Sequence, residues 1–539
     1  MRIDVIDTMP ALARLEQNWN AVYDGDPDAR FFLSWEWLSG WIEQIEGPWF
    51  ILAAKASYED HAPYVAFLPL RIQTKVENGR IHNELNMAGN FAADYTGLLC
   101  LPAAENRVIS AFSRCIKHMN WARLNLENVH VSDSRMRLLL AHFSKADFET
   151  DEISRVGRID NIDNNICPFA VLPSTWDAYM QTLTANSRQK IRRLLRMVDE
   201  TDEYHVSHST LETIDRDLNT LLEFWKVRWT PRKGEFAESI AESNRMMLAR
   251  SFRAGSLFLP TLWKGDRPLA SLATLVDHRK KAFLFYMTGR DEAFEGPPPG
   301  LLLHAYSIRH AIDSQIVEYD FLRGNEAYKY SFGAAERRIR CVIVKTRNGL
   351  NLGSVIDRRT IPDVLREATE LHRAGKLLEA ERGYRQVLRV SRKNADAIHR
   401  LGQLCAARGD NAAAKQLFLT LTSLRPDAYK SWFYLAQACA GLGQYIEATR
   451  HYCEAIRLKP DMVEAFNGLA SILVKLDCVD ELNDALISVI KRLEGGSRAG
   501  RRSQASVGNA AGILKLHRDD CFSLPAVHAP ASILAGSRE

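Results

Sequence analysis

Residues 297–329 read PPPGLLLHAYSIRHAIDSQIVEYDFLRGNEAYK, and the fold of the surrounding region follows from this stretch. Three prolines and Gly300 precede a helical run to about Gln315, and a short apolar strand follows at 317–322. An aromatic run of strand length, residues 281–288, lies just upstream. The order strand, turn, helix, strand predicts a crossover unit whose helix begins beside the carboxyl end of the first strand.

The start of this helix is a candidate anion site. The first amides of a helix have no acceptor inside it, and the helix dipole gives that end a partial positive charge. Gly300 lets a ligand approach the backbone closely, and the prolines fix the turn but supply no N–H donors. We therefore expect a phosphate or pyrophosphate to bind the amides of Gly300, Leu301 and Leu302.

Length and composition predict a multidomain protein without membrane spans. A chain of 539 residues is too long to fold around a single hydrophobic core. Its content of 46% hydrophobic and 25% charged residues is typical of globular proteins. A net charge of +4 argues against DNA as a partner.

The nine cysteines show no CxxC spacing, so we expect reduced thiols and no metal. Without a signal peptide or an 18-residue apolar run, a cytoplasmic location is expected.

Two segments predict mixed α/β structure. Strand-like and helix-like runs alternate over residues 1–165, which indicates a central mixed sheet. Three apolar segments within 256–288 are separated by short turns and predict an antiparallel meander that leads into the crossover unit.

Several short motifs carry a family resemblance. They are PGLLL at 299–303, DFLRG at 320–324, Tyr328-Lys329, WDAY at 176–179, the basic run 188–193, FLSWEWL at 32–38 and Asp94-Tyr95. In this order they resemble the GNAT superfamily of N-acyltransferases, more closely the CelD/BcsL-type acetyltransferases of bacterial cellulose synthesis and more distantly the FemAB peptidyltransferases. The resemblance implies two GNAT-like halves: a degenerate one at 1–165 and a catalytic one at 166–347. The usual pyrophosphate loop R/Q-x-x-G-x-G/A is replaced by GPPPG at 296–300.

The resemblance also implies a reaction. An acyl-CoA, above all acetyl-CoA, would donate its acyl group to an amine or hydroxyl of a small-molecule, saccharide or peptide acceptor. Backbone N–H groups from Phe285 to Thr288, including Met287, would hold the thioester oxygen. The pathway implied is bacterial exopolysaccharide or cell-envelope synthesis.

Such a reaction needs a general base and a group that stabilises the leaving thiolate. Asp320 and Glu326 are the candidate bases, although Asp320 can equally accept backbone N–H groups and order its loop. Tyr286 is the candidate partner of the thiolate, with core packing as the alternative. His304 is a third candidate base, but it is interpreted as a packing histidine.

Other side chains are candidates for substrate binding. Arg323 and Lys329 would engage an acidic acceptor or the cofactor; the alternative for Lys329 is an exposed loop charge. Trp229 would line the acceptor cleft or cap a helix.

Arg188, Arg192 and Arg196 form a stripe with helical spacing beside the core-facing side of one predicted helix. This stripe is either a solvated basic face or a platform for an anionic acceptor or cofactor phosphates.

A repeat follows after residues 348–360, which are interpreted as a linker. Ile398, Ala414, Phe418 and Pro426 recur 34 residues later as Trp432, Ala448, Tyr452 and Pro460. This period is typical of tetratricopeptide repeats and predicts an all-α solenoid in four units: 361–394, 395–428, 429–462 and 463–494. We expect its groove to bind a protein partner, with a structural cap as the alternative. Residues 495–539 are predicted to be a disordered tail.

Two further functions stay open. A FemAB-like transfer of an amino acid from a charged tRNA is compatible with the arginine stripe. A non-catalytic scaffold assembled through the repeats is the other alternative.

Overall fold

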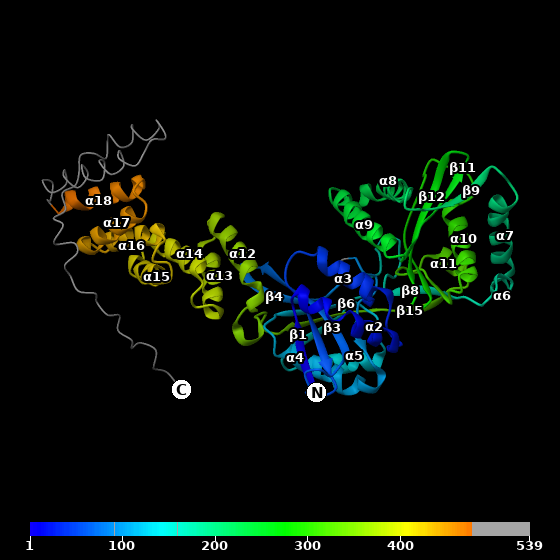
Figure 1. Cartoon of the computed structure of the whole chain (residues 1–539), viewed down its shortest axis with the longest axis horizontal. Helices are drawn as coiled ribbons and strands as arrows, with labels where there is room; N and C mark the ends of the chain where they lie inside the picture. Colours follow the sequence, from blue (N-terminus) through cyan, green and yellow to red (C-terminus); the bar gives the residue numbers. More distant parts are fainter. Residues whose placement is uncertain (91, 159, 477–539) are drawn as a thin grey trace. The chain divides into compact units, whose positions relative to one another are not determined.

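The computed structural model describes residues 1–90, 92–158 and 160–476 and divides the chain into two compact units (Figure 1). The first unit comprises residues 1–75 and 82–360, and the second comprises residues 76–81 and the chain from 361 onward. The first contains two mixed sheets with helices and the second a run of helices, so the predicted fold class is confirmed. The end of the fourth predicted repeat, 477–494, and the predicted tail, 495–539, lie outside the described residues.

The first sheet has the strand order β1-β2-β3-β4-β6-β16-β7, with β5 paired to β3. Strands β4 and β6 run parallel, whereas β1 with β2 and β2 with β3 are antiparallel. The bounds are β1 Arg2–Ile6, β2 Trp49–Lys55, β3 Tyr64–Glu77, β4 Arg80–Met87, β5 Leu99–Cys100, β6 Arg123–Val129, β7 Phe148–Glu152 and β16 Arg340–Thr346.

Two apolar layers cover this sheet because its strands alternate. Along β2, Phe50 and Leu52 belong to one core, whereas Ile51 and Ala53 belong to the other. Helices α4 and α5 contribute to the first core, and α1, α2 and α3 to the second. Their bounds are α1 Met9–Ala13, α2 Glu16–Gly25, α3 Trp35–Gln44, α4 Glu105–Lys117 and α5 Asp133–Leu140.

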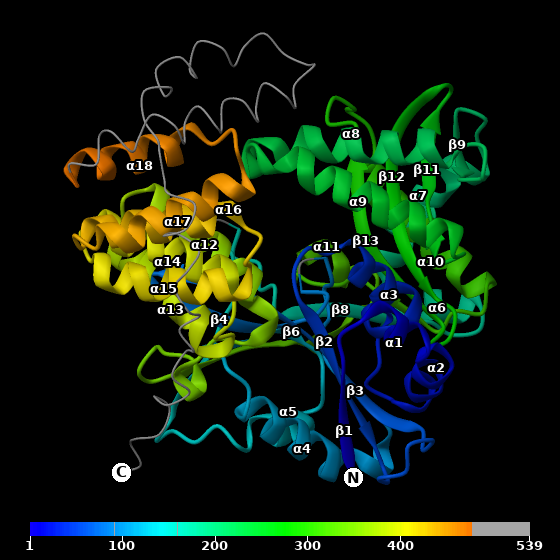
Figure 2. The ribbon, with the colours of Figure 1, turned by 60° about the vertical axis from the view of Figure 1, so that its left-hand side comes forward.

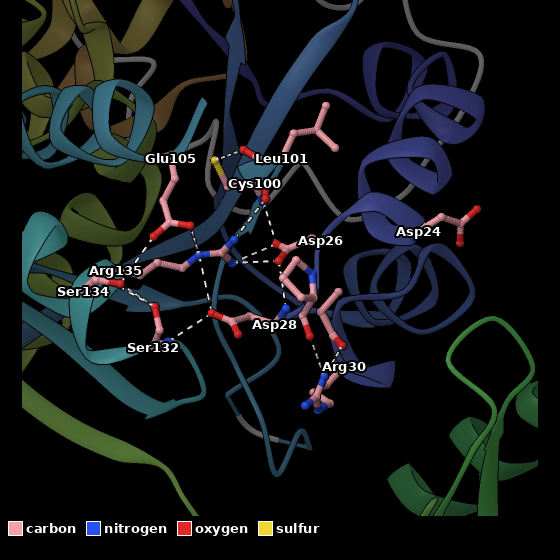
Figure 3. A network of polar contacts seen from close by, with 12 residues as sticks. Asp24, Asp26, Asp28, Arg30, Cys100, Leu101, Glu105, Ser132, Ser134 and Arg135 are labelled. Carbon is pink, nitrogen blue, oxygen red and sulfur yellow. Dashed lines mark hydrogen bonds and ion pairs between the residues drawn. The ribbon is translucent and has the colours of Figure 1, made fainter. Parts of the chain in front are cut away.

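A buried charge network fastens α5 to the turn after α2 (Figure 3). Arg135 is 1% exposed and donates to the Asp26 carboxylate at 2.8 Å and to the Cys100 carbonyl at 3.1 Å. Its Nε also donates to Glu105 at 3.1 Å. Removing one partner of a buried pair leaves the other charge uncompensated, so loss of either Arg135 or Asp26 would destabilise the contact between α5 and this turn.

The second sheet has the order β15-β8-β14-β13-β12-β11-β9, with β10 paired to β12. Strands β11, β12 and β13 are antiparallel, so the predicted meander is confirmed, and β13 pairs with β14 in parallel. The bounds are β8 Ile166–Val171, β9 Tyr204–His208, β10 Leu257–Phe258, β11 Pro260–Lys264, β12 Arg267–Asp277, β13 Ala282–Arg290, β14 Glu318–Asp320 and β15 Ala335–Arg338.

Helices cover both faces of the second sheet: α8 and α9 lie on one side, and α7 and α10 on the other (Figure 1). Gly289 allows α8 to approach β13 closely, since a Cβ there would lie 2.6 Å from the Leu221 carbonyl oxygen. The bounds are α6 Trp176–Thr182, α7 Ala185–Asp199, α8 Ile214–Lys233, α9 Phe236–Arg253, α10 Pro299–Asp313 and α11 Ala327–Tyr330. Pro231 lies inside α8, in its last turn.

At the end of the first unit, the chain returns from the second half to the sheet of the first half. Strand β16 follows the second half in sequence but pairs with β6 and β7 of the first sheet. Residues 348–360, interpreted as a linker, continue along that sheet: the Leu352 amide donates to the Trp121 carbonyl at 2.9 Å, and the Asp357 amide to Asn83 Oδ1 at 2.7 Å.

From residue 361 to residue 476, the second unit is built of helices that pack in succession as antiparallel pairs. Their bounds are α12 Ile361–Arg373, α13 Leu377–Val390, α14 Ala395–Ala407, α15 Asn411–Leu424, α16 Tyr429–Gly441, α17 Tyr445–Leu458 and α18 Val463–Lys475. A Cβ on Gly402 would lie 2.7 Å from Phe418 Cζ, so a small residue is required where α14 and α15 close on one another. Within the described residues, no helix is long and apolar enough to cross a membrane.

Candidate functional site

The N-terminus of α10 has amides without a hydrogen-bond acceptor. The helix begins at Pro299, and the Leu302 amide donates to the Pro298 carbonyl at 3.3 Å. The amides of Gly300 and Leu301 have no acceptor among the described residues. A Cβ built on Gly300 would have no described atom within 4 Å. Two N–H donors without an acceptor and the dipole of a 15-residue helix therefore lie at a position where a Cβ on Gly300 would meet open space.

Strands β13 and β14 diverge just before this helix. Their parallel pairing ends at Leu284 and Asp320, while β13 continues to Arg290. A β-bulge at Tyr286 follows, because Phe285 pairs with Thr274 and Met287 with Ala273 of β12. Because of the bulge, the consecutive residues Tyr286 and Met287 both pack in the core on the α8 and α9 side of the sheet. Phe285 packs on the opposite side, which α10 covers.

Aromatic side chains line the α10 side of the divergence. Phe285, Leu301 and Tyr328 are half-buried there, around a His304 that is 3% exposed. His304 Nδ1 lies 3.0 Å from the Tyr319 hydroxyl. Burial, and to a smaller extent Lys329, lowers the pKa of His304 to about 3, so its ring is neutral. These contacts agree with the interpretation of His304 as a packing residue.

Arginines surround the loop between β13 and α10. Arg228 of α8 donates to Glu292 at 2.9 Å, and Arg290 donates to the same carboxylate at 3.0 Å. Arg290 and then Arg228 lower the pKa of Glu292. These two arginines were not among the predicted binding residues, although Arg290 ends the strand that leads into the predicted turn.

Tyr286 lies at the seam between the two halves. Its hydroxyl is 3.2 Å from the Ala92 carbonyl and 3.0 Å from Asn244 Oδ1. The Trp37 and Phe32 rings of the first half pack against it, and burial raises its pKa. The hydroxyl therefore faces α9 and the first half rather than the α10 mouth.

Asp320 is enclosed in the same seam. It is 0% exposed and accepts from the Tyr95 hydroxyl at 2.7 Å, the Leu322 amide at 2.8 Å and Arg337 at 2.6 Å. Burial raises the pKa of Asp320 to about 6, and Arg337 offsets part of that effect. The geometry favours the alternative in which Asp320 orders its loop; its role as a base stays a prediction.

Lys329 and Arg323 fix the loop after β14. Lys329 is 1% exposed and donates to the carbonyls of Arg323 at 2.9 Å and Gly324 at 2.8 Å. Arg323 in turn donates to Asp94 of the first half at 2.7 Å. The alternative of an exposed charge at Lys329 is therefore wrong, because the ammonium replaces water at two buried carbonyls.

Replacing Lys329 with Met should lower the free energy of unfolding of the first unit by about 2–3 kcal/mol, since charge-assisted hydrogen bonds are lost. Hydrogen–deuterium exchange of peptides covering 321–330 measures the effect. Lys345→Met is the matched control, because Lys345 is a half-buried lysine, 34% exposed, that pairs with the exposed Asp151 at 3.0 Å. Equal protection in the two variants would contradict the assignment.

Glu326 is the more accessible of the two candidate acids. Its side chain is 34% exposed and lies 2.9 Å from the Lys329 ammonium. Tyr328, two residues on, has a pKa raised by burial and then by Glu326, which places this carboxylate beside the aromatic lining. The structure thus brings Asp320, Arg323, Glu326 and Lys329 together in one loop.

The other predicted binding residues lie on separate helices. Trp229 packs against Trp225 with ring centroids 6.4 Å apart, and the Arg232 guanidinium lies 5.4 Å from its ring. Arg188 donates to the Leu183 carbonyl at 2.8 Å, whereas Arg192 is exposed on α7.

Comparison with known families defines the class. Residues 185–330 match the family described as "Acetyltransferase (GNAT) domain", and residues 429–462 match the tetratricopeptide repeat. The chain therefore contains a GNAT-type acetyltransferase domain and at least one tetratricopeptide repeat. The GNAT domain implies use of an acyl-CoA, and the repeat suggests protein–protein interaction.

Two curated proteins are similar to this chain over less than a third of its length. The superkiller complex protein 3 of Mus musculus is 28% identical over 155 residues, which is 28% of this chain and 10% of that protein. Its Homo sapiens counterpart is 28% identical over 172 residues, 31% of this chain and 11% of that protein. The chain thus spans about a tenth of the length of these relatives.

Among solved structures, a conserved protein of unknown function from Bacteroides thetaiotaomicron is 14% identical with a TM-score of 0.40, covering 64% of this chain and 100% of its own. A mutant O-GlcNAc transferase from Thermobaculum terrenum is 30% identical with a TM-score of 0.21. The match covers 21% of this chain and 22% of that transferase chain.

Proposed function

We propose that the chain is an acyl-CoA-dependent N- or O-acyltransferase, above all an acetyltransferase, whose donor site lies at the N-terminus of α10. The observation that carries this proposal is the pair of unpaired amides at Gly300 and Leu301 beside open space, next to the diverging strand β13. It fits the family match, which covers both elements.

The residues present fit an acyl-CoA. The amides of Gly300 and Leu301 would accept the diphosphate. Arg228 and Arg290, now paired with Glu292, would supply positive charge at the same loop. The half-buried rings of Phe285 and Tyr328 would pack on the acyl arm.

Acyl-CoA supplies an acyl group activated as a thioester. Beyond Leu284, the edge of β13 that faces β14 has no strand partner within the described residues, so its N–H groups would stabilise the carbonyl oxygen. The acceptor nitrogen or oxygen bonds to the carbonyl carbon and the C–S bond breaks. Glu326 would take the acceptor's proton, and the departing thiolate takes up one proton, so charge balances.

The wider setting is also part of the proposal. The motifs similar to CelD/BcsL proteins support a role in bacterial exopolysaccharide or cell-envelope synthesis in the cytoplasm. The repeat region would bind a protein partner through its groove.

Calorimetry of the full chain with acetyl-CoA tests the donor site. We expect saturable binding in the micromolar range, with an affinity that falls as salt rises because phosphate contacts are screened. Free CoA should bind with similar affinity, because it carries the same diphosphate. Absence of heat at millimolar acetyl-CoA would remove the proposal.

A second candidate, aminoacyl transfer from a charged tRNA, is favoured by one observation. Within the described residues, no ion pair involves the α7 side chains Lys190, Arg192, Arg193 and Arg196. Filter binding of tRNA that is lost when these four residues are neutralised, with no acetyl-CoA binding, would favour this candidate.

A further inference from the structure

Two arginines from different elements share one carboxylate. Arg228 lies on α8 and Arg290 ends β13, and these two elements pack against each other in the first unit (Figure 2). Arg228 donates to Glu292 Oε1 at 2.9 Å, and Arg290 donates to the same oxygen at 3.2 Å and to Oε2 at 3.0 Å. Guanidinium groups therefore engage both oxygens of Glu292.

This cluster carries more positive than negative charge. Arg290 and then Arg228 lower the pKa of Glu292, so the carboxylate is ionised at neutral pH. In the part of the chain that the structure describes, no other carboxylate pairs with either arginine. Two guanidinium groups against one carboxylate leave one positive charge without a partner. A phosphate group with two negative charges would neutralise both arginines, and arginine binds phosphate oxygens in the same bidentate way.

The cluster lies on the loop that leads into α10. Asp291 fixes the start of this loop, because its amide donates to the Leu269 carbonyl at 2.8 Å and its side chain accepts from Arg267 Nε at 2.8 Å. Phe294 and Leu301 pack against the same apolar cluster. The loop is thus joined to the first turn of α10, whose amides form the proposed diphosphate site.

Arg228 also lies near the aromatic lining of the donor site. Burial raises the pKa of Tyr328, Glu326 adds to this effect and Arg228 opposes it. The Tyr328 ring lies 5.5 Å from the ring of His304 in α10. The arginine pair therefore adjoins side chains that would pack on the acyl arm.

Glu292 can leave the arginines without a change of fold. Its side chain is 35% exposed, and within the described residues only Arg228 and Arg290 donate hydrogen bonds to its carboxylate. Rotation about the side-chain bonds would move the carboxylate into water, and exposed side chains rotate within nanoseconds. The backbone stays in place because Asp291 is anchored on β12.

We propose that Arg228 and Arg290 form a phosphate subsite of the donor site and that Glu292 occupies this subsite until the donor displaces it. Glu292 is then an internal competitor, which holds the two arginines in the free protein and lowers the affinity for the donor. The subsite selects a thioester that carries its own phosphates over one without phosphate. The assignment of that phosphate to acyl-CoA rests on the proposed function; binding of a phosphate to the arginine pair does not.

A matched pair of variants in one loop tests the competition. Calorimetry measures the binding of sodium pyrophosphate and, separately, of acetyl-CoA to the full chain. Glu292→Gln keeps the size of the side chain and removes its charge, so both ligands should bind about 5- to 10-fold more tightly. Glu295→Gln removes the same charge three residues on, where the side chain is exposed and forms no ion pair with a described residue. It should change either affinity by less than about twofold, because water and salt screen an exposed charge.

A second variant tests whether the gain comes from the arginines. Arg290→Gln should weaken pyrophosphate binding by about 5- to 10-fold. In the double variant Arg290→Gln/Glu292→Gln, most of the gain from Glu292→Gln should disappear, because the two side chains act on one another. Thermal unfolding shows whether each variant is folded. Equal pyrophosphate affinities of Glu292→Gln and Glu295→Gln, or a full gain in the double variant, would overturn the proposal.

The two ligands separate this inference from the proposed function. If acetyl-CoA binds and Glu292→Gln affects neither ligand more than Glu295→Gln does, the competition proposal fails and the transferase proposal stands. If Glu292→Gln strengthens pyrophosphate binding but acetyl-CoA does not bind, the arginine pair is a phosphate site and the acyl-transfer proposal fails.

Discussion

Gly300→Glu should weaken acetyl-CoA binding by about 100-fold, which corresponds to about 2.8 kcal/mol. The new carboxylate would occupy the open space in front of Gly300 and repel the diphosphate held by the α10 amides. The fold should not suffer, because a Cβ at this position meets no described atom within 4 Å. A negative side chain in the first turn of a helix also stabilises that helix through its interaction with the helix dipole.

Gly300→Gln is the matched control, since it has the same size and no charge. We expect a loss of only about tenfold from its bulk, so the difference between the two variants isolates the electrostatic part. Calorimetry with acetyl-CoA gives both dissociation constants, and thermal unfolding confirms that both variants are folded. Unchanged affinity in Gly300→Glu would show that α10 does not hold the diphosphate.

Asp320→Ala should destabilise the first unit by about 3–5 kcal/mol, the usual cost of removing one partner of a buried ion pair. The substitution leaves the guanidinium of Arg337 and the hydroxyl of Tyr95 without their acceptor. Glu318→Ala is the control on the same strand, because Glu318 also binds Arg337 at 2.7 Å but its side chain is 21% exposed. It should cost under about 1 kcal/mol.

Hydrogen–deuterium exchange of peptides covering β14 and residues 92–97 measures both variants locally, which matters because a two-unit chain does not unfold in one step. Loss of transferase activity in Asp320→Ala with unchanged protection would instead identify Asp320 as the general base.

The Asp320 carboxyl group should also make the free energy of unfolding fall as pH rises. The folded pKa of Asp320 is about 6, against 3.8 for the free group, so between these values the folded chain binds a proton that the unfolded chain lacks. Its contribution to stability is therefore complete below about pH 4 and lost as pH rises through about 6. Relative to Asp320→Asn, which cannot titrate, wild type should lose about 3 kcal/mol across this window.

Much of the local structure was predictable from sequence. The 34-residue step depends on side chains that must recur wherever one helix pair packs on the next, so the match at 429–462 confirms the predicted tetratricopeptide repeat. The helix after Gly300 and the meander before it were likewise predictable, because their signals lie within a few residues of one another.

The candidate site was predictable only in part. Gly300 and Leu301 have their predicted free amides, since helix starts are local features. Lys329 was predicted to engage an acidic acceptor or the cofactor, with an exposed loop charge as the alternative, yet it is buried against carbonyls that only the folded loop brings to it. Tyr286 was predicted on β13, but the bulge that turns it toward the first half arises from pairing with β12.

By itself, the sequence determined the class of domains, the order of the main helices and strands around α10, and the repeat, because periodicity and turn chemistry are properties of short segments. Only the tertiary structure decided that β16 returns to the first sheet and that Tyr95 and Arg337 enclose Asp320. Apart from the Arg337–Asp320 pair, these features join residues more than 100 positions apart, and no local pattern records such pairings.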